Sequence, residues 1–246
     1  MRVAVISDTH GNAQALRAVL AAIDARGPWD QIVMGGDFAF GGPFPAECIA
    51  LIRERGIPAV RGNTDEAIVE AARGPLPEWS EEEAYAPHDP ELLRLDHWAL
   101  ARLSEDQVAY LAELPLRVEL GDAGGPQLTV AHATPWSPYP AVQGDAPEPV
   151  ARRMLDAAGT EALVYGHIHL QYAREVDGRL LVATGSVGLP FDGSPAADYA
   201  EFTSNRSGWE VELRAAPYDA GAVIEAARRL ELPNVPALLR RLGPGA

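Results

Sequence analysis

Short apolar runs and helical patterns alternate in the first quarter of the chain. Three of the runs predict strands: Arg2–Ile6, Gln31–Gly35 and Ile57–Arg61. Between the first two, apolar residues recur at the spacing of a helix with one buried face. These residues are Leu16, Val19, Leu20 and Ile23. The alternation of strand and helix favours a parallel sheet covered by helices.

Capping residues mark where two of these helices begin or end. Asn12 stands where its side chain can cap the first helix. A second helix is expected from Pro45 to Arg55, because proline suits the first turn of a helix and Gly56 follows the last.

The pattern changes between Gly74 and Leu116, where the sequence is rich in glutamate and interrupted by proline. Two helices are expected there, at Glu91–Leu103 and Glu105–Leu114, and Ser104 with Gln107 has the form of a capping box. We interpret residues 74–116 as a helical cap inserted into a single domain that spans residues 1–246.

Strand patterns return in the second half of the chain, and Asp177-Gly178 predicts the turn of a hairpin. A final amphipathic helix is expected at Ala220–Leu230. The expected strands are Leu116–Leu120, Gln127–Ala131, Ala162–Tyr165, Leu180–Thr184, Tyr199–Thr203 and Trp209–Leu213.

Composition places the chain among ordinary globular proteins. Of its 246 residues, 47% are hydrophobic and 22% are charged. No apolar run is long enough for a membrane span. The apolar run at the N-terminus is too short for a signal peptide, and the single cysteine, Cys48, cannot form an intramolecular disulfide. We therefore expect a cytoplasmic protein without a membrane partner.

The charge of the chain is strongly negative, at −15, and all 20 of its basic residues are arginine. From Glu78 to Asp122, twelve acidic residues stand against three arginines. Such a surface repels the phosphate backbone of nucleic acids, so no nucleic-acid polymer is expected as a partner.

Five of the strand-like runs end directly in possible metal ligands. Such ends meet at one edge of an α/β sheet, where active sites commonly form. Taken singly, each group has a simpler interpretation as a turn or as a hydrogen-bonded core histidine. The joint pattern is hard to explain by chance, because it uses four of only six histidines. The residues are Asp8 and His10, Asp37, Asn63, His132, and His167 with His169.

In this order and spacing the motifs resemble the calcineurin-like metallophosphoesterase superfamily, over nearly the whole chain. They are Asp8-x-His10, Gly36-Asp37, Gly62-Asn63-x-Asp65, His132 and Gly166-His167-x-His169. Gly185-Ser186-Val187-Gly188 and the segment Leu103 to Pro115 resemble the small bacterial and archaeal phosphodiesterase branch. The resemblance implies an α/β fold, a two-sheet αββα sandwich.

The resemblance also implies two divalent metal ions. One would be held by Asp8, His10, Asp37 and His169, and the other by Asp37, Asn63, His132 and His167, with Asp37 bridging. Oxygen and nitrogen ligands without thiolate suit Mn, Fe, Co, Ni or Zn. A hydroxide between the ions would attack phosphorus in line. Asn63, Thr64 and Asp65 are the residues expected to act in catalysis.

Three positions depart from the pattern of the superfamily. Thr64 stands where many members have a histidine that protonates the leaving group or binds phosphate, and a hydroxyl is too weak an acid to replace it. Ala133 stands in place of a common glycine, and Phe191 in place of a basic residue. His88 and His97 are candidates for a substitute proton donor, or are surface residues.

The function that this resemblance implies is hydrolysis of a small phosphate ester, with phosphodiesters or activated phosphate esters favoured. The alternatives are a phosphomonoesterase, including one that acts on phosphoproteins, and a non-catalytic scaffold of the same fold. The natural substrate and the oligomeric state do not follow from the sequence.

Overall fold

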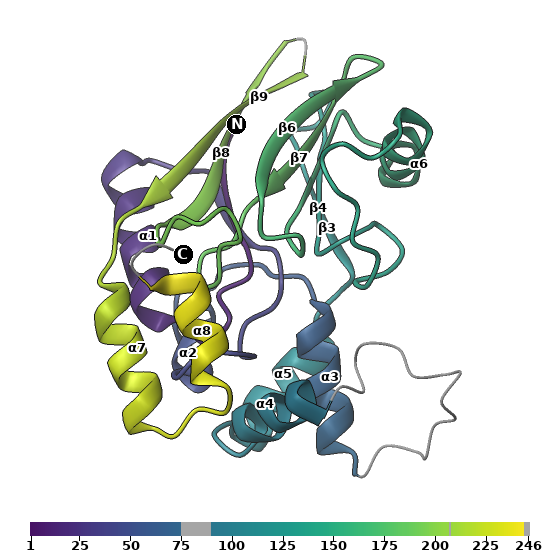
Figure 1. The fold of residues 1–246 in the computed structure, drawn as a ribbon. Coiled ribbons are helices and arrows are strands. Elements are labelled where there is room, and N and C mark those ends of the chain that lie inside the picture. Colours follow the sequence, from purple (N-terminus) through teal and green to yellow (C-terminus); the bar gives the residue numbers. More distant parts are fainter. Residues whose placement is uncertain (75–89, 207, 244–246) are drawn as a thin grey trace.

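Two β-sheets packed face to face form the centre of the computed structural model, which describes residues 1–74, 90–206 and 208–243 (Figure 1). The first sheet has the strand order β2-β1-β8-β9 and the second β3-β4-β5-β7-β6. The first comprises β1 (Arg2–Ile6), β2 (Gln31–Met34), β8 (Ala197–Asn205) and β9 (Gly208–Ala216). The second comprises β3 (Arg117–Leu120), β4 (Leu128–Ala131), β5 (Ala162–Tyr165), β6 (Gln171–Val176) and β7 (Arg179–Thr184).

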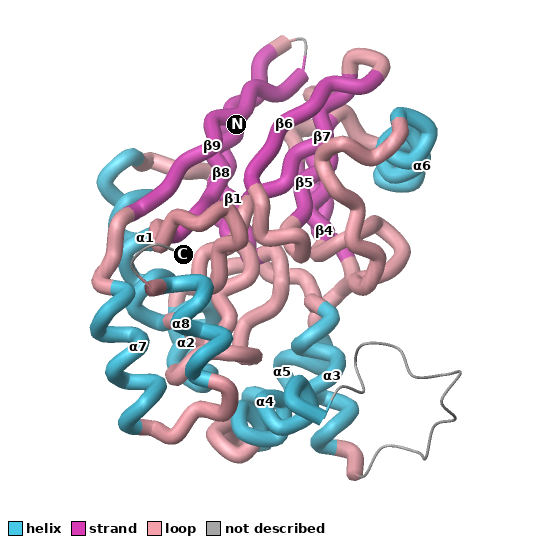
Figure 2. The backbone as a smooth tube through the Cα atoms, in the orientation of Figure 1, coloured by secondary structure: helices cyan, strands magenta, loops and turns pink. Residues whose placement is uncertain are grey.

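Parallel pairing within each sheet brings strand ends together. β1 pairs in parallel with β2, and β5 pairs in parallel with both β4 and β7. The loops that follow these strands therefore leave from one edge of the sandwich, where ligand sites form in α/β sheets. Figure 2 shows these loops crowded between the strands and the lower helices.

Alternating side chains of β1 serve two different cores. Val3 and Val5 point into the space between the sheets, where they pack in one cluster with Val130 and Val164 of the second sheet. Ile6 points the other way, as the two-residue period of a strand requires. One strand therefore joins the sheet-on-sheet core to the helix-on-sheet core.

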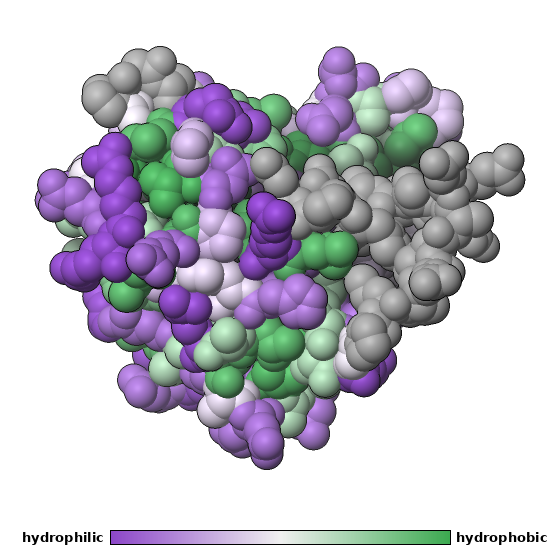
Figure 3. Space-filling view, turned by 60° about the horizontal axis from the view of Figure 1, so that its bottom comes forward, coloured by the Kyte–Doolittle hydropathy of each residue, from purple (hydrophilic) through white to green (hydrophobic). Residues whose placement is uncertain are grey.

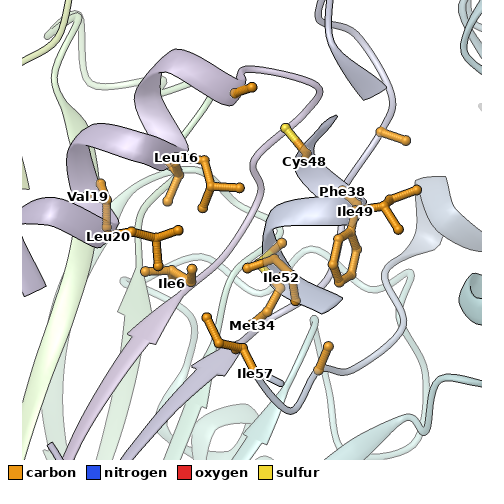
Figure 4. Packing of buried hydrophobic residues seen from close by; sticks show 14 of the residues in the cluster. Ile6, Leu16, Val19, Leu20, Met34, Phe38, Cys48, Ile49, Ile52 and Ile57 are labelled. Carbon is orange, nitrogen blue, oxygen red and sulfur yellow. The ribbon is translucent and has the colours of Figure 1, made fainter. Parts of the chain in front are cut away.

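Two helices, α1 (Ala13–Arg26) and α2 (Pro45–Glu54), cover the outer face of the first sheet. Figure 4 shows Leu16 and Leu20 of α1 and Ile52 of α2 around Ile6 and Met34. Burying each such side chain contributes roughly 1.5–3 kcal/mol. The Asn12 side chain accepts the backbone N–H of Ala15 at 3.1 Å, which confirms the predicted cap.

On the outer face of the second sheet lies α6 (Glu148–Ala158), whose Met154 and Leu155 pack with Leu163 and Leu181. Helices thus cover both outer faces, and the predicted αββα sandwich is confirmed. The sequence pattern did not predict α6. No helix in the described ranges is both long and apolar enough to cross a membrane.

The inserted segment contains α4 (Pro90–Leu100) and α5 (Glu105–Glu113), close to the two expected helices. Ser104 and Gln107 form the predicted capping box, with bonds of 3.2 and 3.1 Å. Ala99 and Leu111 belong to the same buried cluster as Ile6. We infer that the insertion is part of one domain with the sandwich.

At the C-terminal end, α7 (Ala220–Arg229) and α8 (Val235–Leu242) pack against α4 through Leu95. Helix α7 matches the expected amphipathic helix, whereas α8 was not predicted. Figure 3 turns the bottom of the view in Figure 1 toward the reader, and hydrophobic residues lie among hydrophilic ones on that face.

The predicted strand at Ile57–Arg61 is wrong. Only a single bridge, between Met34 and Ala59, joins this segment to β2. Pro58 has no N–H to donate to a ladder, and the N–H of Arg61 bonds to the carbonyl of Pro115 at 2.9 Å instead. The chain then enters a helix that was not predicted, α3 (Asn63–Ala72).

The predicted hairpin turn at Asp177-Gly178 is confirmed between β6 and β7. Both residues have positive φ angles, 52° for Asp177 and 73° for Gly178. A two-residue hairpin turn of type I′ requires this conformation at both of its central positions.

Candidate metal centre

Four of the predicted ligands form a buried cluster where the loops after β1, β2 and β5 meet. Ligand atoms of Asp8, His10, Asp37 and His169 all lie within 4.8 Å of one another. His169 Nε2 is 3.2 Å from Asp8 Oδ1, and His10 Nε2 is 3.6 Å from Asp37 Oδ2. These are the four residues predicted to hold one metal ion.

The other predicted ligands gather beside this cluster, around His132. Its Nε2 lies 2.9 Å from Asn63 Oδ1, 3.2 Å from His167 Nδ1 and 3.6 Å from Asp37 Oδ1. Asp37 therefore directs one oxygen toward each group. All seven predicted ligands come together, in the two sets that the resemblance implies.

Hydrogen bonds to backbone carbonyls fix the orientation of three imidazoles. His10 Nδ1 bonds to the carbonyl of Phe40 at 2.9 Å and His169 Nδ1 to that of Leu189 at 2.6 Å. His132 Nδ1 bonds to the carbonyl of Gly35 at 2.8 Å. Since a carbonyl only accepts, Nδ1 must carry the proton, and the neutral ring then presents an unprotonated Nε2 to the cluster.

The Nε2 atoms of these rings face other electron-rich atoms. His10 Nε2 and His169 Nε2 are 3.0 Å apart, and neither has a proton to donate in the neutral tautomer. His132 Nε2 faces the carbonyl oxygen of Asn63 in the same way. Lone pairs directed at one another repel, whereas a cation between them would be bound by both. The residues present therefore fit divalent ions.

Backbone geometry at the cluster is unusual. Positive φ angles of 47° to 64° occur at five of the seven predicted ligands. This region costs side-chain-bearing residues about 1–3 kcal/mol each, and such strain persists only where the surrounding structure imposes it. The five residues are Asp8, His10, Asp37, His167 and His169.

Two glycines are required by the close approach of the carboxylates. A Cβ atom at Gly62 would collide with Asp37 Oδ1, and one at Gly166 would collide with Asp8 Oδ2. These glycines belong to the Gly62-Asn63 and Gly166-His167 motifs. The collisions explain why glycine precedes the ligand in each motif.

Asp65 lies behind the cluster. It is fully buried, and its two oxygens accept the backbone N–H groups of Asp37, Phe38 and Gly62 at 2.8, 2.9 and 2.9 Å. Burial, followed by the nearby Asp37, raises the pKa of Asp65 to about 6. Its carboxyl holds the loop that carries Asp37 and is not among the residues that line the neighbouring cavity.

The electrostatics of the cluster favour cations. Burial would raise the pKa of Asp8, but the imidazoles of His169 and His10 outweigh it and hold that pKa well below its usual range. Burial lowers the pKa of His10, yet Asp8 and Asp37 raise it overall. Burial and the neighbouring His132 lower the pKa of His167. The ionised carboxylate of Asp8 thus attracts positive charge.

A cavity of about 360 Å³ opens onto the cluster. Thr64 lines it, and the backbone N–H of Thr64 donates to Asp37 Oδ1 at 3.0 Å. Most of the remaining wall is apolar, and none of the lining residues that the structure describes is an arginine. Apart from Thr64, Asp96 and the predicted ligands, the described lining residues are Phe40, Ala67, Leu92, Tyr139, Ala141, Leu189 and Phe191.

Asp96 of α4 also lines this cavity, and the sequence analysis missed it. Of the two histidines considered there as proton donors, His97 is exposed and is absent from the described lining, and His88 lies outside the described residues. Phe191 lines the cavity at the position where a basic residue was expected, and the guanidinium of Arg241 stacks over its ring at 3.7 Å.

A family model for the calcineurin-like phosphoesterase superfamily domain matches residues 1–206. The chain belongs to this superfamily. It is 29% identical to a metallophosphoesterase from Sphaerobacter thermophilus, whose crystal structure it matches with a TM-score of 0.76 over 100% of this chain and 99% of that one. The resemblance inferred from the motifs is confirmed.

Two further relatives come from archaea. An uncharacterized protein of Methanocaldococcus jannaschii is 27% identical over 249 residues, which is 94% of each chain. A hypothetical protein from Pyrococcus horikoshii shares the fold, with a TM-score of 0.80 and 19% identity over 100% of this chain and 99% of that one. As a member of the superfamily, the chain is a phosphoesterase with a buried Asp/His cluster suited to divalent metal.

Proposed function

We propose that this phosphoesterase is a dinuclear enzyme that hydrolyses phosphodiesters or activated phosphate esters. One ion is held by Asp8, His10, Asp37 and His169, and the other by Asp37, Asn63, His132 and His167. The observation that carries the proposal is the 3.0 Å approach of His10 Nε2 to His169 Nε2, in two imidazoles whose Nδ1 atoms both bond to backbone carbonyls. The matching approach of His132 Nε2 to Asn63 Oδ1 supports the second ion.

When bound, two such ions activate a water molecule and neutralise the charge of the phosphate. The protein supplies the orientation. Asp37 is held in place by the N–H of Thr64, and Asp8 accepts the N–H of His167 at 3.1 Å. Ligands fixed by such bonds bind an ion with little loss of conformational entropy.

The cavity wall supports a substrate with one negative charge. A phosphodiester carries a single charge and a second organic group, whereas a monoester carries up to two charges and a polyphosphate more. Without arginine among the described lining residues, the wall offers no cationic side chain to balance extra charge. Apolar residues such as Phe40, Leu92 and Leu189 suit the organic group of an ester.

Turnover of a substrate panel tests the proposal. The protein is loaded with Mn²⁺, Fe²⁺, Co²⁺, Ni²⁺ or Zn²⁺ in turn and is given bis(4-nitrophenyl) phosphate, 4-nitrophenyl phosphate and a dinucleoside polyphosphate at equal concentration. We expect the diester to be turned over fastest with at least one metal. Faster turnover of the monoester would favour a phosphomonoesterase, and no turnover with full metal loading would favour a non-catalytic scaffold.

A further inference from the structure

Asp96 is a carboxyl group in the cavity wall that is not one of the predicted metal ligands. It lies on α4 of the insertion, only 3% of its surface is exposed, and it lines the cavity together with Asp37 and Thr64. Its Oδ1 atom is buried and has no hydrogen-bond partner among the described residues. A buried carboxyl oxygen without a partner costs folding free energy, so the packing of the fold does not explain why a carboxyl stands at this position.

The structure gives Asp96 the properties of a weak acid. Burial, followed by the nearby Asp37, raises the pKa of its carboxyl to about 7. The described titratable groups that share the cavity wall with Asp96 are Asp37, Tyr139 and three imidazoles, those of His10, His167 and His169. On α3, the helix that packs against α4, the lining residues are the uncharged Asn63, Thr64 and Ala67.

Asp96 is the strongest candidate for a proton donor in the described lining of the cavity. Burial raises the pKa of the Tyr139 phenol, which is therefore a weaker acid than Asp96. The hydroxyl of Thr64 is too weak an acid to protonate a departing alkoxide near neutral pH. The imidazoles of the lining are occupied as the proposed metal ligands, and His97 beside Asp96 is exposed. Thr64 and Asp96 approach the same cavity from the packed helices α3 and α4.

We propose that Asp96 is the proton donor to the leaving oxygen of the ester, a role that rests on the proposed phosphoesterase function. As the bond between phosphorus and the leaving oxygen breaks, the carboxyl proton of Asp96 passes to that oxygen and an alcohol departs. The water that adds to phosphorus releases a proton in turn, and Asp96 is reprotonated from solvent. One water is consumed and the protons balance.

A donor matters most for poor leaving groups. An alkoxide or phenolate of high pKa needs the proton, whereas 4-nitrophenolate leaves readily without it. Loss of Asp96 should therefore steepen the dependence of rate on the pKa of the leaving group. A residue that only supports the fold would lower the rate for all esters alike.

The experiment compares two monoanionic diesters, methyl phenyl phosphate and methyl 4-nitrophenyl phosphate, with Mn²⁺-loaded wild type, Asp96→Asn and Glu113→Gln. Glu113 is exposed on α5, so its variant removes one charge from the same insertion without touching the cavity. We expect Asp96→Asn to lower kcat for the phenyl ester by about 10²-fold or more and to change the nitrophenyl ester far less. Glu113→Gln should match the wild type.

Equal losses on both esters, or no loss on the phenyl ester, would overturn the assignment of Asp96. If the wild type with full metal loading hydrolysed neither ester, the proposed function itself would fail. Manganese content and circular dichroism show whether Asp96→Asn folds and loads normally. If it does not, Asp96→Ala, which leaves no polar group at the site, is compared with the wild type on the same two esters.

Discussion

Asp65 accepts the backbone N–H of Asp37 at 2.8 Å, and this bond fixes the loop whose carboxylate faces both groups of predicted ligands. The same carboxyl accepts two further N–H groups, those of Phe38 and Gly62. Asp65 belongs to the motif that predicted a catalytic role for it, and its contacts show how it acts on the site through Asp37.

Asp65→Asn should weaken metal binding without removing a ligand. An amide in place of the carboxylate turns an N–H donor toward backbone N–H groups, so at least one bond is lost. We expect Mn²⁺ affinity to fall by about 10–100-fold and the free energy of unfolding to fall by about 1–3 kcal/mol. Titration calorimetry and urea unfolding measure the two effects. Glu70→Gln, on the exposed side of the same helix, should change neither.

Thr64→His should restore a proton donor where Asp96 has been removed. Both residues line the same cavity, so an imidazole at position 64 can reach the leaving oxygen from the other helix. In the Asp96→Asn background, we expect Thr64→His to recover turnover of methyl phenyl phosphate but to add little for the nitrophenyl ester. The dependence of kcat on leaving-group pKa across a series of aryl esters measures the recovery. An unchanged slope would show that position 64 does not reach the leaving group.

Asp198, which is not one of the predicted metal ligands, should make the free energy of unfolding depend on pH. Burial, followed by Asp192, raises its pKa to about 7 in the folded chain. In an unfolded chain the pKa of an aspartate is about 4. The folded state therefore binds the proton more tightly, and this stabilisation, complete below about pH 4, is lost as the pH rises to about 7.

Asp198→Asn removes this dependence. The variant should gain stability relative to the wild type as the pH is raised from about 4 to about 8, as urea unfolding at several pH values would show. Asp145→Asn, at an exposed position, provides the control. A constant difference between Asp198→Asn and wild type across this range would contradict the argument.

The negative charge of the chain should exclude nucleic-acid polymers. Of the net charge of −15, about nine units belong to the stretch from Glu78 to Asp122. Like charges slow encounter with a polyanion, so we expect negligible binding of long single-stranded DNA in fluorescence anisotropy at moderate salt. Tight, salt-sensitive binding would show that an arginine surface dominates instead.

The sequence indicates which side chains gather at the cluster because most of them follow a strand closely. His132 comes straight after β4, and His167 comes two residues after β5, so the pairing of the strands fixes where these side chains lie. Asn63 reaches the cluster for a different reason. Its supposed strand is a single bridge, and the start of α3 positions it.

Asp96 could not be located in this way. Its place in the cavity depends on how α4 packs against α3, which no local pattern states. One signal was available: Leu92, Asp96 and Ala99 fall on one face of the helix, so Asp96 is a carboxyl at a buried position. The capping box at Ser104 was found because it depends only on residues three positions apart.

The number of metal ions bound per chain tests the central claim most directly. Protein stripped with a chelator is titrated with Mn²⁺, and the stoichiometry is measured for wild type, His169→Ala, His132→Ala and Asp37→Asn. We expect two ions for the wild type, one tight ion for each histidine variant, and weakened binding of both for Asp37→Asn. A wild-type stoichiometry of zero or one at saturating Mn²⁺ would contradict the dinuclear site.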